Sequence, residues 1–231
     1  PGFRIVGTSP GAPFAAIVPL AGTADGSGWA VALVDGPAHL ALPGAYQLEN
    51  AALAVAGAEA LAAAGLPVTR AAIRAGLADA RWPGRLERLA DPAGGAWLLD
   101  GAHNADAAAA LVATWEPPAA VVAGFRADKE AATMVRLLTV GGRPLVVAPV
   151  PGMASWGAAD LAAASAGPVF DAADLDQALA IARRLAPTGG AAHVVRARRP
   201  ASVVARDDLP GDHAHLRRRL VEEVQRRLLI L

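Results

Sequence analysis

The sequence predicts an α/β fold whose longer part contains a mostly parallel sheet. From about residue 85 onward, short apolar runs alternate with helical patterns, which is typical of βαβ units. Apolar residues make up 54% of the chain and charged residues 18%, a composition that can bury a core. Strands and then helices come before this part. The tripeptide Trp82-Pro83-Gly84 cannot continue a helix, so it predicts a boundary between two parts.

The first part, residues 1–84, is expected to begin with strands and continue with two helices. Apolar runs between Gly, Pro, Ser and Asp clusters indicate strands. Apolar residues at helical spacing then predict a long helix, and Thr69 is a good N-cap for a shorter one. The expected strands are 3–6, 14–18, 29–34 and 39–42, and the expected helices are 47–65 and about 70–77.

The second part, residues 85–231, is expected to form the α/β sheet. A helix should start directly after Asn104, and another over 128–138 has Asp128 near its N-terminus. The other strands and helices follow from short apolar runs and from helical periodicity. The expected strands are 86–91, 96–100, 119–125, 144–150 and 191–195, and the further helices are 161–165, 175–185 and 215–231.

Composition and charge exclude several classes of function. The 21 basic and 21 acidic residues leave no net charge, so neither nucleic acid nor a membrane surface is an expected partner. The chain has no cysteine, which excludes disulfides, thiolate catalysis and thiolate metal sites and fits a cytoplasmic location. The longest apolar stretch, residues 51–66, contains Gly57 and Glu59 and is too interrupted and too rich in small residues to predict a membrane span. The missing initial Met suggests a processed or partial chain.

The segment DGAHN, residues 100–104, is the first candidate site. Asp100 ends a predicted strand, Gly101 permits a turn, and a helix follows. Open α/β sheets bind ligands at this edge, and helix N-termini favour anions. Asp100 could hold two ribose hydroxyls, and His103 could reach a phosphate or a base. Alternatively, Asp100 and Asn104 cap the helix and His103 is solvated.

Two further segments add candidates. In WPGRLE, residues 82–87, the guanidinium of Arg85 follows a rigid turn and offers a planar fork for phosphate oxygens. An ordinary surface arginine is the alternative. In GAYQLENA, residues 44–51, Asn50 could pair with a base edge. Here the alternative is that Tyr46, Gln47 and Asn50 cap the long helix.

The order of these three segments resembles folylpolyglutamate synthase, including the bifunctional dihydrofolate synthase form, of the Mur ligase superfamily. The stretch Asp128-Lys129-Glu130 also matches a family segment, and the resemblance covers residues 40 to 187. It implies that residues 1–84 are the end of a Mur-ligase-type central ATPase domain. Residues 85–231 would then be the Rossmann-like C-terminal domain, with an atypical tail from about residue 191.

The resemblance also implies a function. These enzymes use ATP and Mg²⁺ to add L-glutamate to a folate or dihydropteroate carboxylate through an acyl phosphate, and the full-length forms are usually monomers. Arg85 would reach the γ-phosphate and His103 would lie beside the nucleotide, both as catalytic residues. Asp100 would hold the ribose, Asn50 would lie near the adenine, and Asn104 would shape the turn.

The chain departs from the family at the phosphate-binding loop. That loop needs a Lys after a Gly, but the only lysine is Lys129, which follows Asp128. We therefore expect a partial chain that is inactive by itself and lacks most of the metal ligands. The alternatives are a half-enzyme that works with a separate P-loop chain, or a non-catalytic module that binds nucleotide or glutamate. A cell-wall Mur ligase fits these motifs less well.

Overall fold

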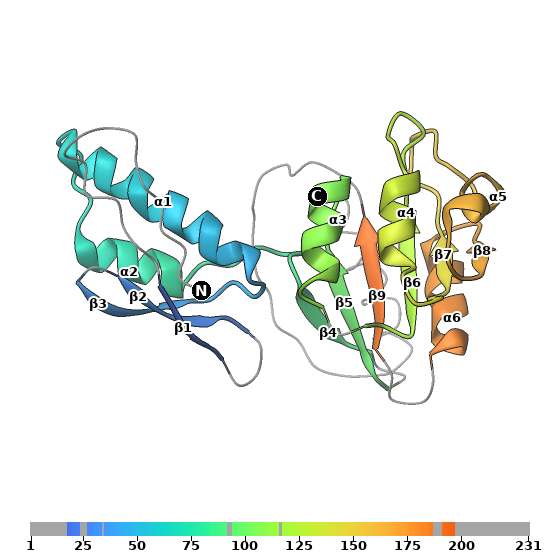
Figure 1. Cartoon of the computed structure of the whole chain (residues 1–231), viewed down its shortest axis with the longest axis horizontal. Coiled ribbons are helices and arrows are strands. Elements are labelled where there is room, and N and C mark those ends of the chain that lie inside the picture. The colour runs from blue at the N-terminus through green and yellow to red at the C-terminus, as the bar shows by residue number, and fades with distance from the viewer. Residues whose placement is uncertain are drawn as a thin grey trace. The chain divides into compact units, whose positions relative to one another are not determined.

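The chain divides into two compact units, Pro1–Trp82 and Pro83–Leu231, and each unit has its own hydrophobic core. The computed structural model in Figure 1 describes residues 18–23, 27–33, 35–91, 94–115, 117–186 and 191–196. The division lies close to the boundary that the Trp-Pro-Gly tripeptide predicts.

The first unit is a three-stranded antiparallel sheet with two helices. The sheet has the order β1-β2-β3, and Gly36, with a φ of 121°, turns the chain between β2 and β3. Both helices lie on the same side of this sheet (Figure 1) and share a core with it. The elements are β1 (Val18–Gly22), β2 (Trp29–Leu33), β3 (Gly36–Leu40), α1 (Tyr46–Ala63) and α2 (Arg70–Ala78).

The predicted start of α2 is confirmed. The Thr69 side chain accepts a hydrogen bond from the Ala72 N–H at 3.1 Å, as an N-cap should. Helix α1 has no such side-chain cap, because its N-cap is Ala45. The idea that Tyr46, Gln47 or Asn50 caps α1 is therefore wrong. These residues lie inside the helix, which begins at Tyr46.

The second unit contains a six-stranded sheet in the order β4-β5-β9-β6-β7-β8. Only β4 is antiparallel to its neighbour, so the predicted mostly parallel sheet is confirmed. The strands are β4 (Glu87–Ala90), β5 (Ala96–Asp100), β6 (Ala120–Gly124), β7 (Leu145–Val147), β8 (Val169–Asp171) and β9 (Ala191–Arg196).

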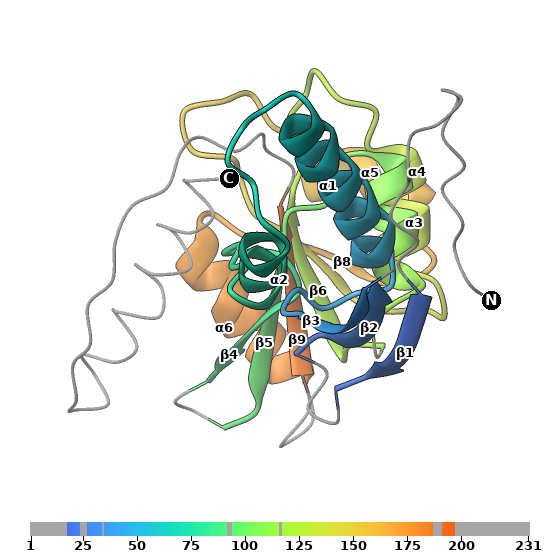
Figure 2. The same ribbon diagram turned by 90° about the vertical axis from the view of Figure 1, so that its left-hand side faces the viewer.

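Helices cover both faces of the second sheet. Figure 2 shows α6 on one side and α3, α4 and α5 on the other. All five residues of the central strand β6 are buried, as expected for a parallel strand with both faces covered. The helices are α3 (Ala105–Val112), α4 (Ala132–Leu138), α5 (Ala158–Leu161), the 3-10 turn η1 (Ala162–Ala164) and α6 (Leu175–Leu185).

Some predicted elements differ from the structure. Helix α4 begins at Ala132 and not at 128, because the Lys129 N–H donates to the Arg126 carbonyl in a preceding turn. The helix predicted over 161–165 begins earlier, at Ala158, and ends as a 3-10 turn. Strand β8 was not predicted, since its three residues give no periodic signal.

Three predictions concern segments that are wholly or mostly outside the described residues. These are the strand over 3–6, most of the strand over 14–18, and the helix over 215–231. The strand predicted over 191–195 is confirmed as β9, which pairs with β5 and β6. Among the described helices, none combines the length and the apolar character that a membrane crossing requires.

Candidate functional site

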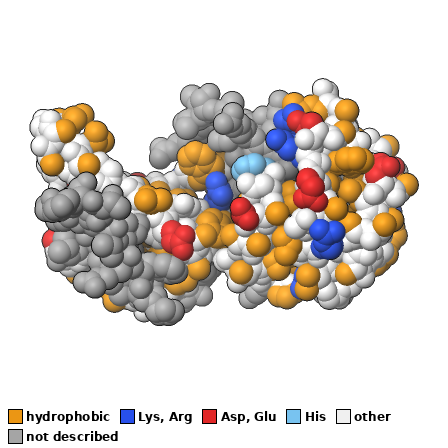
Figure 3. All heavy atoms as spheres, turned by 45° about the horizontal axis from the view of Figure 1, so that its top comes forward, with side chains coloured by type: hydrophobic (Ala, Val, Ile, Leu, Met, Phe, Trp, Pro, Cys, Tyr) orange, Lys and Arg blue, Asp and Glu red, His pale blue; other side chains and the backbone are white. Residues whose placement is uncertain are grey.

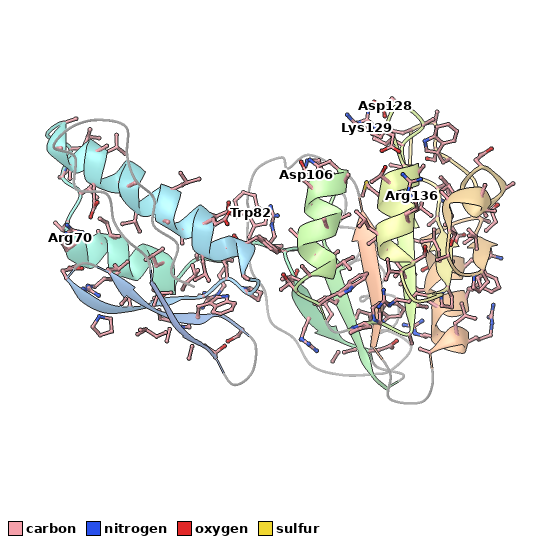
Figure 4. The ribbon with its side chains drawn as sticks, viewed as in Figure 1. Arg70, Trp82, Asp106, Asp128, Lys129 and Arg136 are labelled. Carbon is pink, nitrogen blue, oxygen red and sulfur yellow. The ribbon has the colours of Figure 1, made fainter. Side chains whose placement is uncertain are left out.

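The candidate site lies at the carboxyl edge of the parallel sheet in the second unit. Strand β5 ends at Asp100 and strand β6 at Gly124, and parallel strands end at the same edge. The DGAHN turn follows β5, and the segment 125–131 follows β6. Figure 4 shows Asp106, in the first turn of α3, and Lys129 at this edge. Open α/β sheets bind ligands there.

Asp100 is buried, with 3% of its surface exposed. Its Oδ1 accepts a hydrogen bond from the Ala102 N–H at 2.8 Å, and its Oδ2 accepts one from the Leu86 N–H at 3.1 Å. These bonds show that the helix-cap alternative is wrong for Asp100.

Asn104 and His103 complete the turn after β5. The Asn104 side chain accepts a hydrogen bond from the Ala107 N–H at 2.8 Å, so the capping alternative is confirmed for this residue. His103 is exposed, and its Nδ1 lies 3.2 Å from the Gly101 carbonyl oxygen. A carbonyl can only accept, so Nδ1 donates in this bond. The other ring nitrogen, Nε2, takes no part in this hydrogen bond.

Arg85 lies in a turn with unusual backbone geometry. Gly84 and Leu86, its neighbours, have φ angles of 70° and 47°. Leu86 is the one residue other than glycine with a positive φ in the part of the chain that the structure describes. Strained backbone of this kind persists only where the surroundings hold it, often at functional sites.

Two carboxylates hold the Arg85 turn. Glu87 Oε2 accepts the Gly84 N–H at 2.7 Å, and Asp100 Oδ2 accepts the Leu86 N–H. The hydrogen bond from Leu86 to Asp100 thus joins the WPGRLE and DGAHN segments. Sequence reasoning missed Leu86 and Glu87 as site residues. The sequence carries one signal for Glu87, which is that an acidic residue lies three positions after a glycine that permits a turn.

The segment after β6 forms a second loop at this edge. Arg126 and Asp128 make a bidentate pair at 2.8 and 2.6 Å. The Lys129 carbonyl oxygen accepts the Trp156 indole N–H at 3.0 Å, and the lysine itself is exposed. Figure 4 shows Asp128 and Lys129 together beyond the sheet. These contacts fix the backbone of the loop and present one ammonium group to solvent.

Asn50 lies on α1 in the first unit, not in the unit that contains Arg85 and Asp100. It donates to the side-chain oxygen of the buried Gln47 at 2.8 Å. Both residues line a cavity of about 440 Å³ in this unit. Most of its wall is apolar, formed by Leu40, Leu42, Ala51, Ala54, Val55, Ala58, Val68, Ala72, Ile73, Gly76, Leu77 and Ala80.

One face of the surface carries charges of both signs. Figure 3 shows acidic and basic side chains interspersed with apolar ones on the visible side. Within the described residues, no group of three His, Asp or Glu side chains could hold a metal ion. The functional groups of the candidate site are the guanidinium of the half-buried Arg85, the buried carboxylate of Asp100 and the imidazole of the exposed His103.

The chain is similar to folylpolyglutamate synthases over part of their length, although no family model matches it. Folylpolyglutamate synthase of Lacticaseibacillus casei is 38% identical over 116 residues, covering 48% of this chain and 27% of that protein. The Mycobacterium tuberculosis folylpolyglutamate synthase, solved with ADP and AMPPCP, has a TM-score of 0.60 at 27% identity. That match covers 74% of this chain and 42% of the solved chain.

Escherichia coli FolC, solved in complex with DHPP and ADP, has a TM-score of 0.56 at 30% identity. That match covers 73% of this chain and 40% of the solved chain. The chain thus spans less than half the length of these relatives. The resemblance that the three sequence motifs indicate is confirmed by these similarities.

Proposed function

We propose that this chain is the C-terminal portion of an ATP-dependent amide ligase of the folylpolyglutamate synthase type. Its substrates would be ATP, L-glutamate and a folate or dihydropteroate carboxylate. The similarity to enzymes solved with ADP, AMPPCP and DHPP supports this assignment. The order of the three motifs supports it independently.

The proposed reaction has two steps. The substrate carboxylate attacks the γ-phosphorus of ATP, which forms an acyl phosphate and releases ADP. The glutamate amine then attacks the acyl carbon, which forms the amide bond. The nitrogen loses a proton to solvent, and phosphate leaves with the electrons of the broken C–O bond. Both steps develop negative charge on phosphoryl or carbonyl oxygens, so nearby cationic groups and N–H donors lower the barrier.

Each candidate residue has a role in this scheme. Arg85 would contact the transferring phosphoryl group, for which its planar fork is suited. Asp100 would accept the ribose hydroxyls and His103 would lie beside the nucleotide. Asn104 would keep the turn in shape through its cap of α3. Asn50, from the first unit, would pair with the adenine edge.

The observation that carries the proposal is the hydrogen bond from Leu86 to Asp100. Sequence comparison alone identifies two separate motifs, each with a plain structural alternative. The bond joins them at the carboxyl edge of the parallel sheet, where ligands bind in this fold class. An arginine, a carboxylate and a helix N-terminus are then close in the fold, a combination that suits a nucleotide.

The resemblance implies Mg²⁺, but the described residues do not fit a magnesium site. No cluster of three His, Asp or Glu side chains exists among them, and Mg²⁺ prefers carboxylate and phosphate oxygens. We derive no step through the metal. Its ligands would come from a segment that also carries the phosphate-binding lysine, because Lys129 follows Asp128 and cannot belong to a Walker A loop.

The lack of a Walker A lysine also favours a second candidate function. The chain could be a nucleotide- or glutamate-binding module without catalytic activity. It could equally be a half-enzyme that a separate P-loop chain completes. A non-catalytic module would never add glutamate, and a half-enzyme would add it only when a P-loop chain is present. One assay of glutamate addition therefore separates the candidates.

The test is ATP-, Mg²⁺- and folate-dependent addition of labelled glutamate. It is run with the chain alone, and again with the P-loop half of a homologous ligase added as a separate polypeptide. Activity only with the added half is the expected result. Nucleotide binding without turnover in either case would support the non-catalytic module. Neither binding nor turnover would refute the proposal.

A further inference from the structure

We propose that Asp100 is a positioning residue for Arg85, in addition to any contact that it makes with a ribose. The inference rests on the proposed function, in which Arg85 contacts phosphate. Its basis is the backbone of the turn that carries the arginine. Asp100 would act on the arginine through the Leu86 N–H, which donates to its Oδ2 at 3.1 Å.

Hydrogen bonds to two carboxylates hold the backbone on both sides of Arg85. On one side, Glu87 Oε2 accepts the Gly84 N–H at 2.7 Å. On the other side, Asp100 Oδ2 accepts the Leu86 N–H at 3.1 Å. The Leu86 N–H belongs to the peptide directly after Arg85, and the Gly84 N–H belongs to the Pro83–Gly84 peptide, one residue further back. Because the backbone is held at these two points, the directions in which the Arg85 side chain can leave it are restricted.

The Leu86 backbone would not keep this geometry without support. A φ of 47° is strained for a residue with a branched side chain. The Leu86 side chain is nevertheless buried, with 8% of its surface exposed. Burial and the Asp100 bond therefore act together. Loss of the bond should let the turn relax toward negative φ and rotate Arg85 away from its position.

The same carboxylate also fixes the start of the DGAHN turn. Its Oδ1 accepts the Ala102 N–H at 2.8 Å, so Asp100 ties both segments of the site to the end of β5. The binding of a ribose by Asp100 and the binding of a phosphate by Arg85 would then both depend on the Asp100 carboxylate. Asp100 thus has two separable effects on ATP, one at the sugar and one at the phosphates.

Comparison of ATP with adenosine separates these two effects. Both ligands contain the ribose, so loss of a sugar contact lowers both affinities by the same factor. Only ATP contains the phosphates, so loss of the Arg85 orientation lowers the ATP affinity alone. The ratio of the two affinities therefore reports on positioning. A role of Asp100 in stability alone would not change this ratio in the folded protein.

The experiment measures ATP and adenosine affinities of the full chain by titration calorimetry. The variants are Arg85→Ala, Asp100→Ala and the double variant. Asp91→Asn is the matched control, because Asp91 is another buried carboxylate of the same unit whose bonds go to Trp97 and Arg183. The ratio of the ATP affinity to the adenosine affinity is the ATP preference. We expect Arg85→Ala and Asp100→Ala each to reduce it about tenfold. The double variant should reduce it no further, since coupled residues are non-additive.

An unchanged ratio in Asp100→Ala, with the ratio reduced in Arg85→Ala, would overturn the inference and leave the proposed function in place. Additive losses in the double variant would overturn it in the same way. A wild-type chain without ATP preference, or an Arg85→Ala variant that keeps it, would instead overturn the proposed function together with the inference. If Asp100→Ala does not fold, Glu87→Ala loosens the same turn at Gly84 and should reduce the ratio as well.

Discussion

The carboxylate of Asp91 binds the guanidinium of Arg183, 92 residues further along the chain. The Arg183 Nε and Nη2 atoms donate to it at 2.6 and 3.1 Å, and the Trp97 indole N–H donates at 2.8 Å. The Arg183 guanidinium also lies 5.3 Å from the centre of the Trp97 ring. This cluster connects the end of the edge strand β4 to helix α6.

Asp91→Ala should destabilise the second unit by about 2–3 kcal/mol, because it leaves Trp97 and Arg183 without their acceptor. The Asp91 side chain is only 4% exposed, although Arg183 is 26% exposed. Chemical denaturation followed by circular dichroism measures the loss. The control is Asp128→Ala, which removes an exposed bidentate pair and should change stability by less than about 1 kcal/mol. Equal losses for the two variants would contradict the prediction.

Ala105→Pro should be neutral or stabilise the protein by about 0.4–1 kcal/mol. Ala105 is the first residue of α3, where proline is favoured. Asn104 before it has a φ of −148° and a ψ of 173°, the extended geometry that a following proline requires. Thermal unfolding measures the effect.

The matched variant is Ala108→Pro, three residues further along α3. The Ala108 N–H donates to the Asn104 carbonyl at 3.0 Å, so proline there should cost about 3 kcal/mol or more. If both prolines destabilise the protein equally, α3 does not begin at Ala105.

Asn104→Ala should lower stability by about 1 kcal/mol, since the Ala107 N–H loses its acceptor. Asn104→Asp keeps an acceptor and adds a charge that the helix N-terminus favours, so it should retain the wild-type stability. Urea denaturation compares the two. Thr69→Ala, which removes the matching cap of α2, gives the expected size of such a loss in the other unit. An Asn104→Ala variant of wild-type stability would show that the cap is unimportant.

Local patterns predicted much of the fold. The alternation of apolar runs and helices indicated the parallel sheet, and Thr69 and Asn104 were recognisable as caps because their partners are three residues away. The position of β9 between β5 and β6 was not predictable, because strand order depends on pairing between distant segments. The Leu86–Asp100 bond spans 14 residues and has no local signal. The sequence therefore predicts Asp100 as a cap or a ligand and does not predict that it supports the Arg85 turn.

Arg85→Ala should lower the turnover of a reconstituted ligase by about 10²–10³-fold, the usual effect of removing one group that stabilises transition-state charge. The KM for glutamate should change little, because the proposed Arg85 contact is to the phosphates of ATP and strengthens further as phosphoryl charge develops. Arg85→Lys keeps the charge but loses the planar fork, so it should recover only part of the rate. Arg88→Ala is the matched control, since Arg88 is exposed on neighbouring β4. Steady-state glutamate incorporation measures all three variants, and an unchanged turnover in Arg85→Ala would remove Arg85 from the mechanism.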